Sequence, residues 1–388
     1  MRHWFQDAGL KKVVLFTVVF KLTALIVIAI GAVFFPFHTD NYLANFHYPH
    51  DQIPNLFNRF ATWDAQHYLY LADHGYEPGL MSNTFYPLFP FLIHCLSYLF
   101  LGNTLIAGLF LSTLFTIASM CYLYLLVRKN YGGEAAVRAC LLLLAFPMSF
   151  FLGLVYADSL FLMLAIAFFY YEKNDKLWPA IICAFLLPFT RPTGVLIAVI
   201  SFSTVFSNKM PTSKGNFLLR RFYLTTAIAL GFVIYLFIMK ILTGDYLAGF
   251  NAQNYFNSGY SIQNLLHPID WFLKNFINIS YSFNGPMNGV VSRLCFIGFV
   301  VGLVFSFKMF VLTFKTVNDD LWFYALVVGL VSALSGDLMS FPRYLVMIFP
   351  LFVFLAIKLK DKIPYYLVLS IPLQILLIIL YSLNEWVA

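Results

Sequence analysis

A dense group of ionisable side chains lies in the stretch from Arg59 to Pro90. Its core is a set of five residues between positions 64 and 77, although only 11% of the 388 residues are charged. They are Asp64, His67, Asp73, His74 and Glu77. Long apolar runs flank the stretch, and ionisable groups beside a bilayer are costly enough to indicate a functional site. The alternative is an interfacial helix whose charges merely lie among lipid headgroups.

The spacing within this stretch predicts a helix. The three-and-four step of one helical face is followed by Asp64, His67, Tyr68, Leu71 and His74. Asp64 and His67 would then lie together, with Trp63 and Tyr68 beside them. We expect Gly75 to end the helix and the sequence Glu-Pro-Gly at 77–79 to turn the chain.

The composition defines the class of protein around this stretch. Hydrophobic residues make up 61% of the chain, which predicts a polytopic membrane protein rather than a soluble one. The net charge of +7 is explained by the positive-inside rule, so no nucleic-acid partner is expected. The five cysteines are scattered through apolar runs without metal or disulfide spacing, which is typical of small core residues.

The apolar segments predict one transmembrane domain, residues 1–388, with eleven membrane-spanning helices. The expected spans are residues 13–35, 104–127, 139–156, 160–171, 177–189, 193–206, 222–242, 290–312, 321–338, 344–357 and 364–383. Residues 36–103 form a first outer loop that carries the ionisable stretch, and residues 243–289 form a second. Segment 86–101 is short for a span, which needs about 20 residues, so we expect it at the outer interface.

Lysine and arginine orient this topology. Lys11 and Lys12 precede the first span, which places the N-terminus in the cytoplasm, and most of the 24 basic residues then fall on the cytoplasmic side. The opposite face collects distant polar residues: Asp64, His67, Asp73, His74, Asp158, Arg191, Asp337 and Arg343. This convergence favours an active site, and the alternative is a set of helix-end residues that reach water.

Several ordered motifs carry a resemblance to a known family. WDAQHYLYLADHGY at 63–76 and NTFYPLFPFL at 83–92 resemble the signature of the GPI mannosyltransferase 2 (PIG-V) family, including its bacterial branch. AFPMSFFLGLVYADSLF at 145–161 and TRPTG at 190–194 resemble further blocks of that family. Four positions depart from the pattern. Asp73 and Asp158 replace glutamates, Tyr86 replaces a phenylalanine, and Arg59 is displaced from the Trp-Asp pair.

The resemblance implies a GT-C-type membrane glycosyltransferase. Such an enzyme would move a sugar, mannose above all, from a polyprenyl-phosphate sugar to a glycolipid or glycan acceptor, with inversion at the anomeric carbon. It also implies no metal and no cofactor. Asp64, His67, Asp73 and His74 could in principle bind a metal ion, but no standard zinc spacing such as His-Glu-x-x-His is present.

The resemblance and the chemistry together assign roles to residues. Asp64 matches the family's catalytic acidic position and would serve as the base, with His67 orienting it or contacting the donor. Arg191 and Arg343 lie beside prolines at membrane breaks and would balance the leaving phosphate. The remaining candidates are Trp63, Tyr68 and His74 for donor binding, and Asp73, Tyr76, Asp158 and Arg59 for support.

Two other functions stay open at the level of sequence. Broken helices with charges at their ends also suit a lipid or glycan transporter, although transporter sites lie at the bilayer midplane and this hydropathy shows no inverted repeat. The second alternative is a non-catalytic subunit of a glycan-assembly complex. The expected location is a bacterial inner membrane with the active face periplasmic, or the endoplasmic reticulum membrane in a eukaryote.

Overall fold

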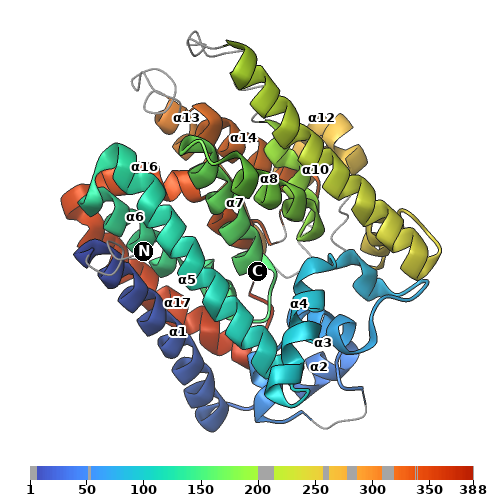
Figure 1. Cartoon of the computed structure of the whole chain (residues 1–388). Coiled ribbons are helices and arrows are strands. Elements are labelled where there is room, and N and C mark those ends of the chain that lie inside the picture. The colour runs from blue at the N-terminus through green and yellow to red at the C-terminus, as the bar shows by residue number, and fades with distance from the viewer. Residues whose placement is uncertain are drawn as a thin grey trace. The chain divides into compact units, whose positions relative to one another are not determined.

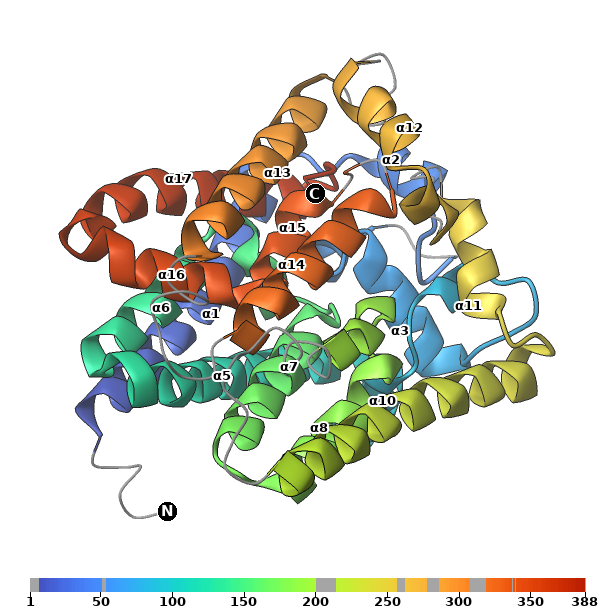
Figure 2. The same cartoon turned by 90° about the horizontal axis from the view of Figure 1, so that it is seen from above.

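The computed structural model describes residues 7–50, 54–199, 214–256, 262–277, 286–307, 319–336, 338 and 340–387. All regular elements in these ranges are helical (Figures 1 and 2). The chain divides into two compact units. The first unit comprises Met1–Glu77, Phe85–Tyr170 and Leu355–Val387, and the second comprises Pro78–Thr84 and Tyr171–Phe354.

The first unit combines the two ends of the chain. Its elements are α1 (Ala8–Phe34), α2 (Thr39–Ala44), η1 (Leu56–Phe60), α3 (Asp64–His74), α4 (Leu88–Ser97), η3 (Tyr98–Phe100), α5 (Thr104–Tyr131), α6 (Gly133–Ala145), η4 (Pro147–Gly153), most of α7 (Asp158–Lys173), η13 (Lys360–Lys362) and α17 (Ile363–Ser382). Helix α1 packs against α5, α6 and α17, and both views show α1 beside α17 (Figures 1 and 2). At this contact a side chain on Gly31 would meet Ser382, with a Cβ 2.7 Å from the Ser382 Oγ.

The second unit is built mainly from the middle of the chain. Its elements are η2 (Met81–Thr84), α8 (Leu177–Leu186), η5 (Leu187–Phe189), η6 (Pro192–Val199), α10 (Lys214–Thr243), α11 (Ala248–Asn251), η7 (Ala252–Tyr255), η8 (Ile262–Leu266), α12 (Pro268–Phe272), η9 (Leu273–Ile277), α13 (Pro286–Phe307), α14 (Asp319–Leu334), α15 (Phe341–Tyr344) and η12 (Leu345–Met347). Helix α8 lies along α10, and α13 packs against α14 and α15 (Figure 2). Helix α16 (Phe349–Leu359) begins in this unit and ends in the first.

Five helices in the described ranges are long and apolar enough to cross a membrane, fewer than the eleven predicted spans. They are Ala8–Phe34, Thr104–Tyr131, Phe217–Thr243, Gly289–Phe307 and Phe349–Ser382. A sixth is counted if α6 and η4, which meet at a bend of 89°, form one broken span. The predicted span 139–156 is therefore bent at Pro147, which cannot continue the hydrogen bonding of α6.

The other predicted spans correspond to shorter or irregular helices. Helices α7 and α14 have 16 residues each, and α8 has 10. Of the predicted span 193–206, the described part is the 3₁₀ helix η6, and the rest lies outside the described residues. Segment 86–101, predicted as interfacial, contains α4 and η3, and its position at the interface stays a prediction.

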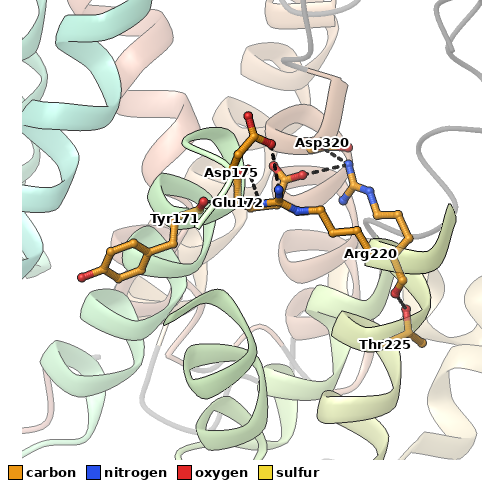
Figure 3. A network of polar contacts seen from close by, with 7 residues as sticks. Tyr171, Glu172, Asp175, Arg220, Thr225 and Asp320 are labelled. Carbon is orange, nitrogen blue, oxygen red and sulfur yellow. Dashed lines mark hydrogen bonds and ion pairs between the residues drawn. The ribbon is translucent and has the colours of Figure 1, made fainter. Parts of the chain in front are cut away.

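A buried ion cluster in the second unit joins the last residues of α7 to α10 and α14. Arg221 on α10 contacts two buried carboxylates through Nη2, Asp320 Oδ2 at 2.9 Å and Glu172 Oε1 at 3.5 Å. Arg220 extends the cluster, because its Nη1 lies 2.7 Å from Asp175 Oδ1 and its Nη2 donates to the carbonyl of Glu172 at 2.6 Å (Figure 3). The cluster thus ties the ends of α7 and α14 to the first turns of α10.

Candidate active site

Helix α3 carries the ionisable stretch and has the boundaries that the spacing predicts. It runs from Asp64 to His74 and ends at Gly75, whose φ of 81° only glycine adopts readily. The Gly75 N–H closes the last turn on the carbonyl of Leu71 at 3.0 Å. The predicted helix is therefore confirmed.

Asp64 lies at the start of this helix and is partly exposed. The first turn of a helix presents unpaired backbone N–H groups and a positive partial charge, which favour a carboxylate there. The residue before it, Trp63, has an unusual backbone conformation with φ 55° and ψ −127°. Its indole Nε1 donates to the carbonyl of Glu385 at 3.1 Å, and its ring meets that of Trp386 edge-on at 4.9 Å.

His67, one turn after Asp64, lies between two phenyl rings. Its imidazole is stacked on Phe46 at a centroid distance of 4.0 Å and on Phe85 at 4.7 Å. Burial lowers the pKa of His67 to about 3, so the ring is neutral at physiological pH. A neutral imidazole can orient a carboxylate through a hydrogen bond, but it offers no positive charge to a phosphate.

Tyr68 is packed into the aromatic core of the first unit. It is 3% exposed, and its ring makes edge-to-face contacts with Phe85 at 5.0 Å and Phe89 at 5.3 Å. Its ring also approaches that of Tyr156 at 6.4 Å. The sequence-based assignment of donor binding to Tyr68 stays a prediction, and in the structure this side chain packs α3 against α4.

The far end of α3 anchors the preceding loop. The Asp73 carboxylate accepts hydrogen bonds from the hydroxyls of Tyr48 at 3.0 Å and Thr104 at 3.1 Å. His74 contacts the same Tyr48 hydroxyl through Nε2 at 3.2 Å, and its ring lies 4.8 Å from that of Tyr70. Both side chains are exposed, and their contacts hold the loop before η1 and the start of α5 against α3.

Three further candidates have well-defined surroundings in the first unit. The Tyr76 hydroxyl donates to the carbonyl of Phe85 at 2.6 Å. Arg59 donates to the carbonyl of Phe35 at 3.2 Å and lies over the ring of Phe37 at 5.3 Å. Asp158 begins α7 and is only 1% exposed. Tyr76 and Arg59 therefore fasten the loop, whereas Asp158 is an interior carboxylate.

The two candidate phosphate-binding arginines belong to the second unit. The Arg191 guanidinium lies over the ring of Tyr344 at 5.8 Å, and Tyr344 directly follows Arg343 in α15. Arg343 is 4% exposed. The TRPTG motif and the sequence FPRY at 341–344, which are far apart in the sequence, are thus side by side, while Asp337 lies outside the described residues.

Sequence reasoning missed the residues that hold the approach to Asp64. They are Tyr156, Tyr381, Glu385 and Trp386. The available signal for Glu385 and Trp386 was the polar and aromatic segment that follows the last apolar run, whereas Tyr156 and Tyr381 lie within predicted spans. Within the described ranges, no group of three or more His, Cys, Asp or Glu residues is arranged to hold a metal ion.

The fold places the chain among polytopic membrane proteins with a GT-C-like architecture. Similar solved structures include the archaeal oligosaccharyltransferase AglB from Archaeoglobus fulgidus in complex with an inhibitory peptide and a dolichol-phosphate, with TM-score 0.53, 12% identity, and 98% of this chain and 56% of that chain covered. Another is ArnT from Cupriavidus metallidurans bound to undecaprenyl phosphate, with TM-score 0.52, 12% identity, and 89% and 60% covered. At this identity the likeness concerns the fold alone, and this chain spans less than two thirds of either structure's length.

The family follows from the sequence. Residues 10–212, more than half of the chain, match the model of the family described as mannosyltransferase (PIG-V). The chain belongs to this mannosyltransferase family. No curated protein sequence matches it.

Proposed function

We propose that the protein is an inverting mannosyltransferase that uses polyprenyl-phosphate mannose and delivers the sugar to a hydroxyl of a glycolipid or glycan. The observation that carries this proposal is the family match over residues 10–212, which contains helix α3 with Asp64 at its start. Lipid-phosphate ligands in two proteins of similar fold, ArnT and AglB, support the choice of donor class.

The reaction needs one base and one stabilised leaving group. The acceptor oxygen attacks the anomeric carbon as its proton passes to the Asp64 carboxylate, and the bond from that carbon to the phosphate oxygen breaks. The electron pair of that bond leaves with the polyprenyl phosphate. One displacement inverts the anomeric centre. Because phosphate is a good leaving group, no acid is required to protonate it.

The surroundings of Asp64 support its role as the base. The side chain is partly exposed, as a group that meets an incoming acceptor must be. The buried and neutral His67, one turn along the same helix, suits a hydrogen-bonding partner that keeps the carboxylate oriented. Neither feature requires a bound metal ion.

Arg191 and Arg343 are the proposed partners of the departing phosphate. A planar guanidinium matches phosphate oxygens in a bidentate geometry and remains charged at any relevant pH. The contact between Arg191 and Tyr344, next to Arg343, supports their action as a pair. Trp63 and His74 complete the proposed contacts to the donor.

We further propose a topology of eleven crossings in a single domain, in a bacterial inner membrane with the active face periplasmic. The short apolar helices α8 and α14 support crossings beyond the five long ones. Residues 36–103 and 243–289 form the outer loops in this arrangement. The transporter and the non-catalytic subunit remain outcomes of the test below.

The test uses protein purified in lipid nanodiscs, with polyprenyl-phosphate mannose and polyprenyl-phosphate glucose supplied separately and a panel of glycolipid acceptors. We expect transfer of mannose, and a loss of about 10²–10⁴-fold in Asp64→Asn, which keeps the shape and removes the base. The matched control is Asp40→Asn, an exposed aspartate of the same loop, with unchanged turnover expected.

Two results would contradict the proposal. Equal turnover in wild type and Asp64→Asn would move the base to another carboxylate. Intact donor binding without transfer to any acceptor would favour a non-catalytic or transporting protein.

A further inference from the structure

Thr62, two residues before Asp64, is held by two tyrosines from distant parts of the chain. Its backbone N–H donates to the Tyr381 hydroxyl at 3.1 Å, and its Oγ1 donates to the Tyr381 carbonyl at 3.1 Å. Its carbonyl accepts from the Tyr156 hydroxyl at 3.0 Å and from the Tyr381 hydroxyl at 3.2 Å. All the polar groups of this fully buried residue are therefore bound by side chains or backbone of α17 and of the segment before α7.

Trp63 is fixed in a backbone conformation that a bulky residue rarely adopts. Its φ of 55° and ψ of −127° lie outside the regions that are favourable for residues with a Cβ. Such a conformation persists only where the surroundings over-determine it, and it is common at functional sites. Here the indole is bound to the Glu385 carbonyl and packed against the Trp386 ring.

The segment from 381 to 386 is itself anchored. The carbonyl of Leu383 accepts from the backbone N–H of His38 at 3.0 Å, and the Glu385 carboxylate contacts the His38 ring. These contacts connect the segment to the chain just after α1. The segment is therefore a fixed support for the approach to α3.

This support acts on the first turn of α3. The Thr62 carbonyl also accepts from the Ala65 N–H at 3.3 Å, and the Trp63 carbonyl accepts from the Gln66 N–H at 3.0 Å. The ψ of Trp63 sets the direction in which the chain enters Asp64. If the 381–386 segment lost its contact with Thr62 or with Trp63, the first turn of α3 and the Asp64 carboxylate would therefore change direction.

We propose that residues 381–386 form a clamp that positions the Asp64 carboxylate for proton transfer, with Tyr381 and Trp386 as its positioning residues. The inference rests on the proposed function, in which Asp64 is the base. Neither residue needs to touch the substrate. The competing explanation is that the segment only closes the helix bundle and contributes to stability.

The structure offers a matched control on the same helix. The hydroxyl of Tyr366, on α17, donates to the carbonyl of Leu142 at 3.2 Å, a contact of the same chemistry without a link to α3. Tyr381→Phe and Tyr366→Phe each remove one hydroxyl and keep the ring. A purely structural role predicts similar consequences for the two variants.

The first experiment measures kcat and KM for both substrates in nanodiscs. We expect Tyr381→Phe to lower kcat by about 10-fold to 100-fold with nearly unchanged KM, because a small displacement of a reacting group has effects of this size. Tyr366→Phe should keep the wild-type kcat. In the Asp64→Asn background Tyr381→Phe should lower the residual rate no further, because the hydroxyl acts through Asp64. Equal losses in the two tyrosine variants, or additive losses with Asp64→Asn, would overturn the proposal.

Rescue by a conservative variant gives a second kinetic test. Trp386→Ala removes the edge-to-face contact with Trp63, whereas Trp386→Phe keeps an aromatic partner. The phenylalanine variant should recover most of the kcat lost in the alanine variant. Equal loss in both would contradict the assignment of Trp386.

Hydrogen exchange separates failure of the clamp from failure of the proposed function. Amides 62–66 should exchange faster in Tyr381→Phe than in Tyr366→Phe, whether or not any sugar is transferred. If the wild type transfers no sugar, the proposed function fails, and unchanged exchange in Tyr381→Phe would overturn the clamp as well. Faster exchange in the inactive protein would support the clamp as a structural device but not its role in proton transfer.

Discussion

At the scale of single residues, Asp64 and His67 on the α3 face have different environments. Asp64 is partly exposed at the helix start, while His67 is enclosed by Phe46 and Phe85. Three-and-four spacing predicted that they share a face, but it could not predict this difference. The partners of His67 come from two segments without helical periodicity, so no pattern in the sequence indicates that they meet.

The enclosure of His67 predicts a specific pH dependence of stability. The pKa is about 3 in the folded protein and about 6.5 when unfolded, so between these values only the unfolded chain binds the proton. Stability should therefore fall as the pH drops from 6.5 toward 3, by about 1.4 kcal/mol per pH unit, and not change through this group above 6.5. Thermal unfolding in nanodiscs at pH 7.5 and 4.5 measures this loss of stability.

The control for this prediction is the comparison of two histidine variants. His67→Asn should reduce the loss of melting temperature at pH 4.5, because asparagine does not titrate. His267→Asn, at an exposed histidine, should leave the loss unchanged. The same pH sensitivity in wild type and His67→Asn would refute the explanation.

At the scale of elements, the buried ion cluster of the second unit predicts unequal effects of two neighbouring arginines. Arg221→Met would leave the Glu172 and Asp320 carboxylates buried without this cation, which costs about 3–5 kcal/mol. Arg220→Met removes a contact to Asp175, whose side chain is 93% exposed, and two bonds to backbone carbonyls. Its cost should be clearly smaller, because exposed ion pairs contribute about 0–1 kcal/mol.

Chemical unfolding in mixed micelles compares these variants. Adding Asp320→Asn to Arg221→Met should recover part of the lost stability, because one uncompensated carboxylate is removed. Equal destabilisation by Arg220→Met and Arg221→Met would show that burial does not determine how much these ion pairs contribute to the free energy of unfolding.

Two helical glycines should respond differently to substitution by alanine: Gly231 lies at the contact between α8 and α10, and Gly298 does not. A Cβ on Gly231 would lie 2.3 Å from the backbone oxygen of Phe185, which cannot move without shifting α8. Gly231→Ala should therefore destabilise the protein, by about 1–3 kcal/mol as in overpacked cores. Gly298 on α13 has open space around the same position, so Gly298→Ala should be neutral or stabilising by up to about 1 kcal/mol. Melting temperatures of both variants test the contrast, and a tolerated Gly231→Ala would disprove the close approach.

Sequence predicted the long helices well and the irregular ones poorly. The spans 13–35, 104–127 and 222–242 correspond to α1, α5 and α10, because each apolar run exceeds the bilayer thickness. The bend between α6 and η4 was missed because hydropathy does not report helix direction. Pro147 was the signal, and it ends α6.

At the scale of the whole molecule, composition and charge defined the class before any motif was needed. The sequence predicted eleven spans, whereas in the described ranges five or six helices have the length and hydropathy that a span requires. Apolar runs of 10 to 16 residues, such as α8 and α14, are ambiguous by length. The approach to Asp64 was beyond sequence reasoning for another reason, since Thr62 and Tyr381 are 319 positions apart.

The orientation of the chain is the last prediction, and it can be tested without knowing any substrate. The proposed topology puts the loop before α3 outside and the turn between α7 and α8 in the cytoplasm, because Lys173 and Lys176 lie at that turn. Cysteines introduced at the exposed positions Asn45 and Asp175 should therefore differ in labelling by a membrane-impermeant maleimide.

The background variant is Cys95→Ser, because Cys95 is exposed whereas Cys140 and Cys183 are buried. We expect Asn45→Cys to react in intact cells and Asp175→Cys to react only after permeabilisation. Labelling of both positions from outside would show that α3 and the turn between α7 and α8 lie on the same side of the membrane, which contradicts the proposed topology. Labelling of position 175 alone would put Asp64 in the cytoplasm, where a nucleotide sugar rather than a polyprenyl-phosphate sugar would be the available donor.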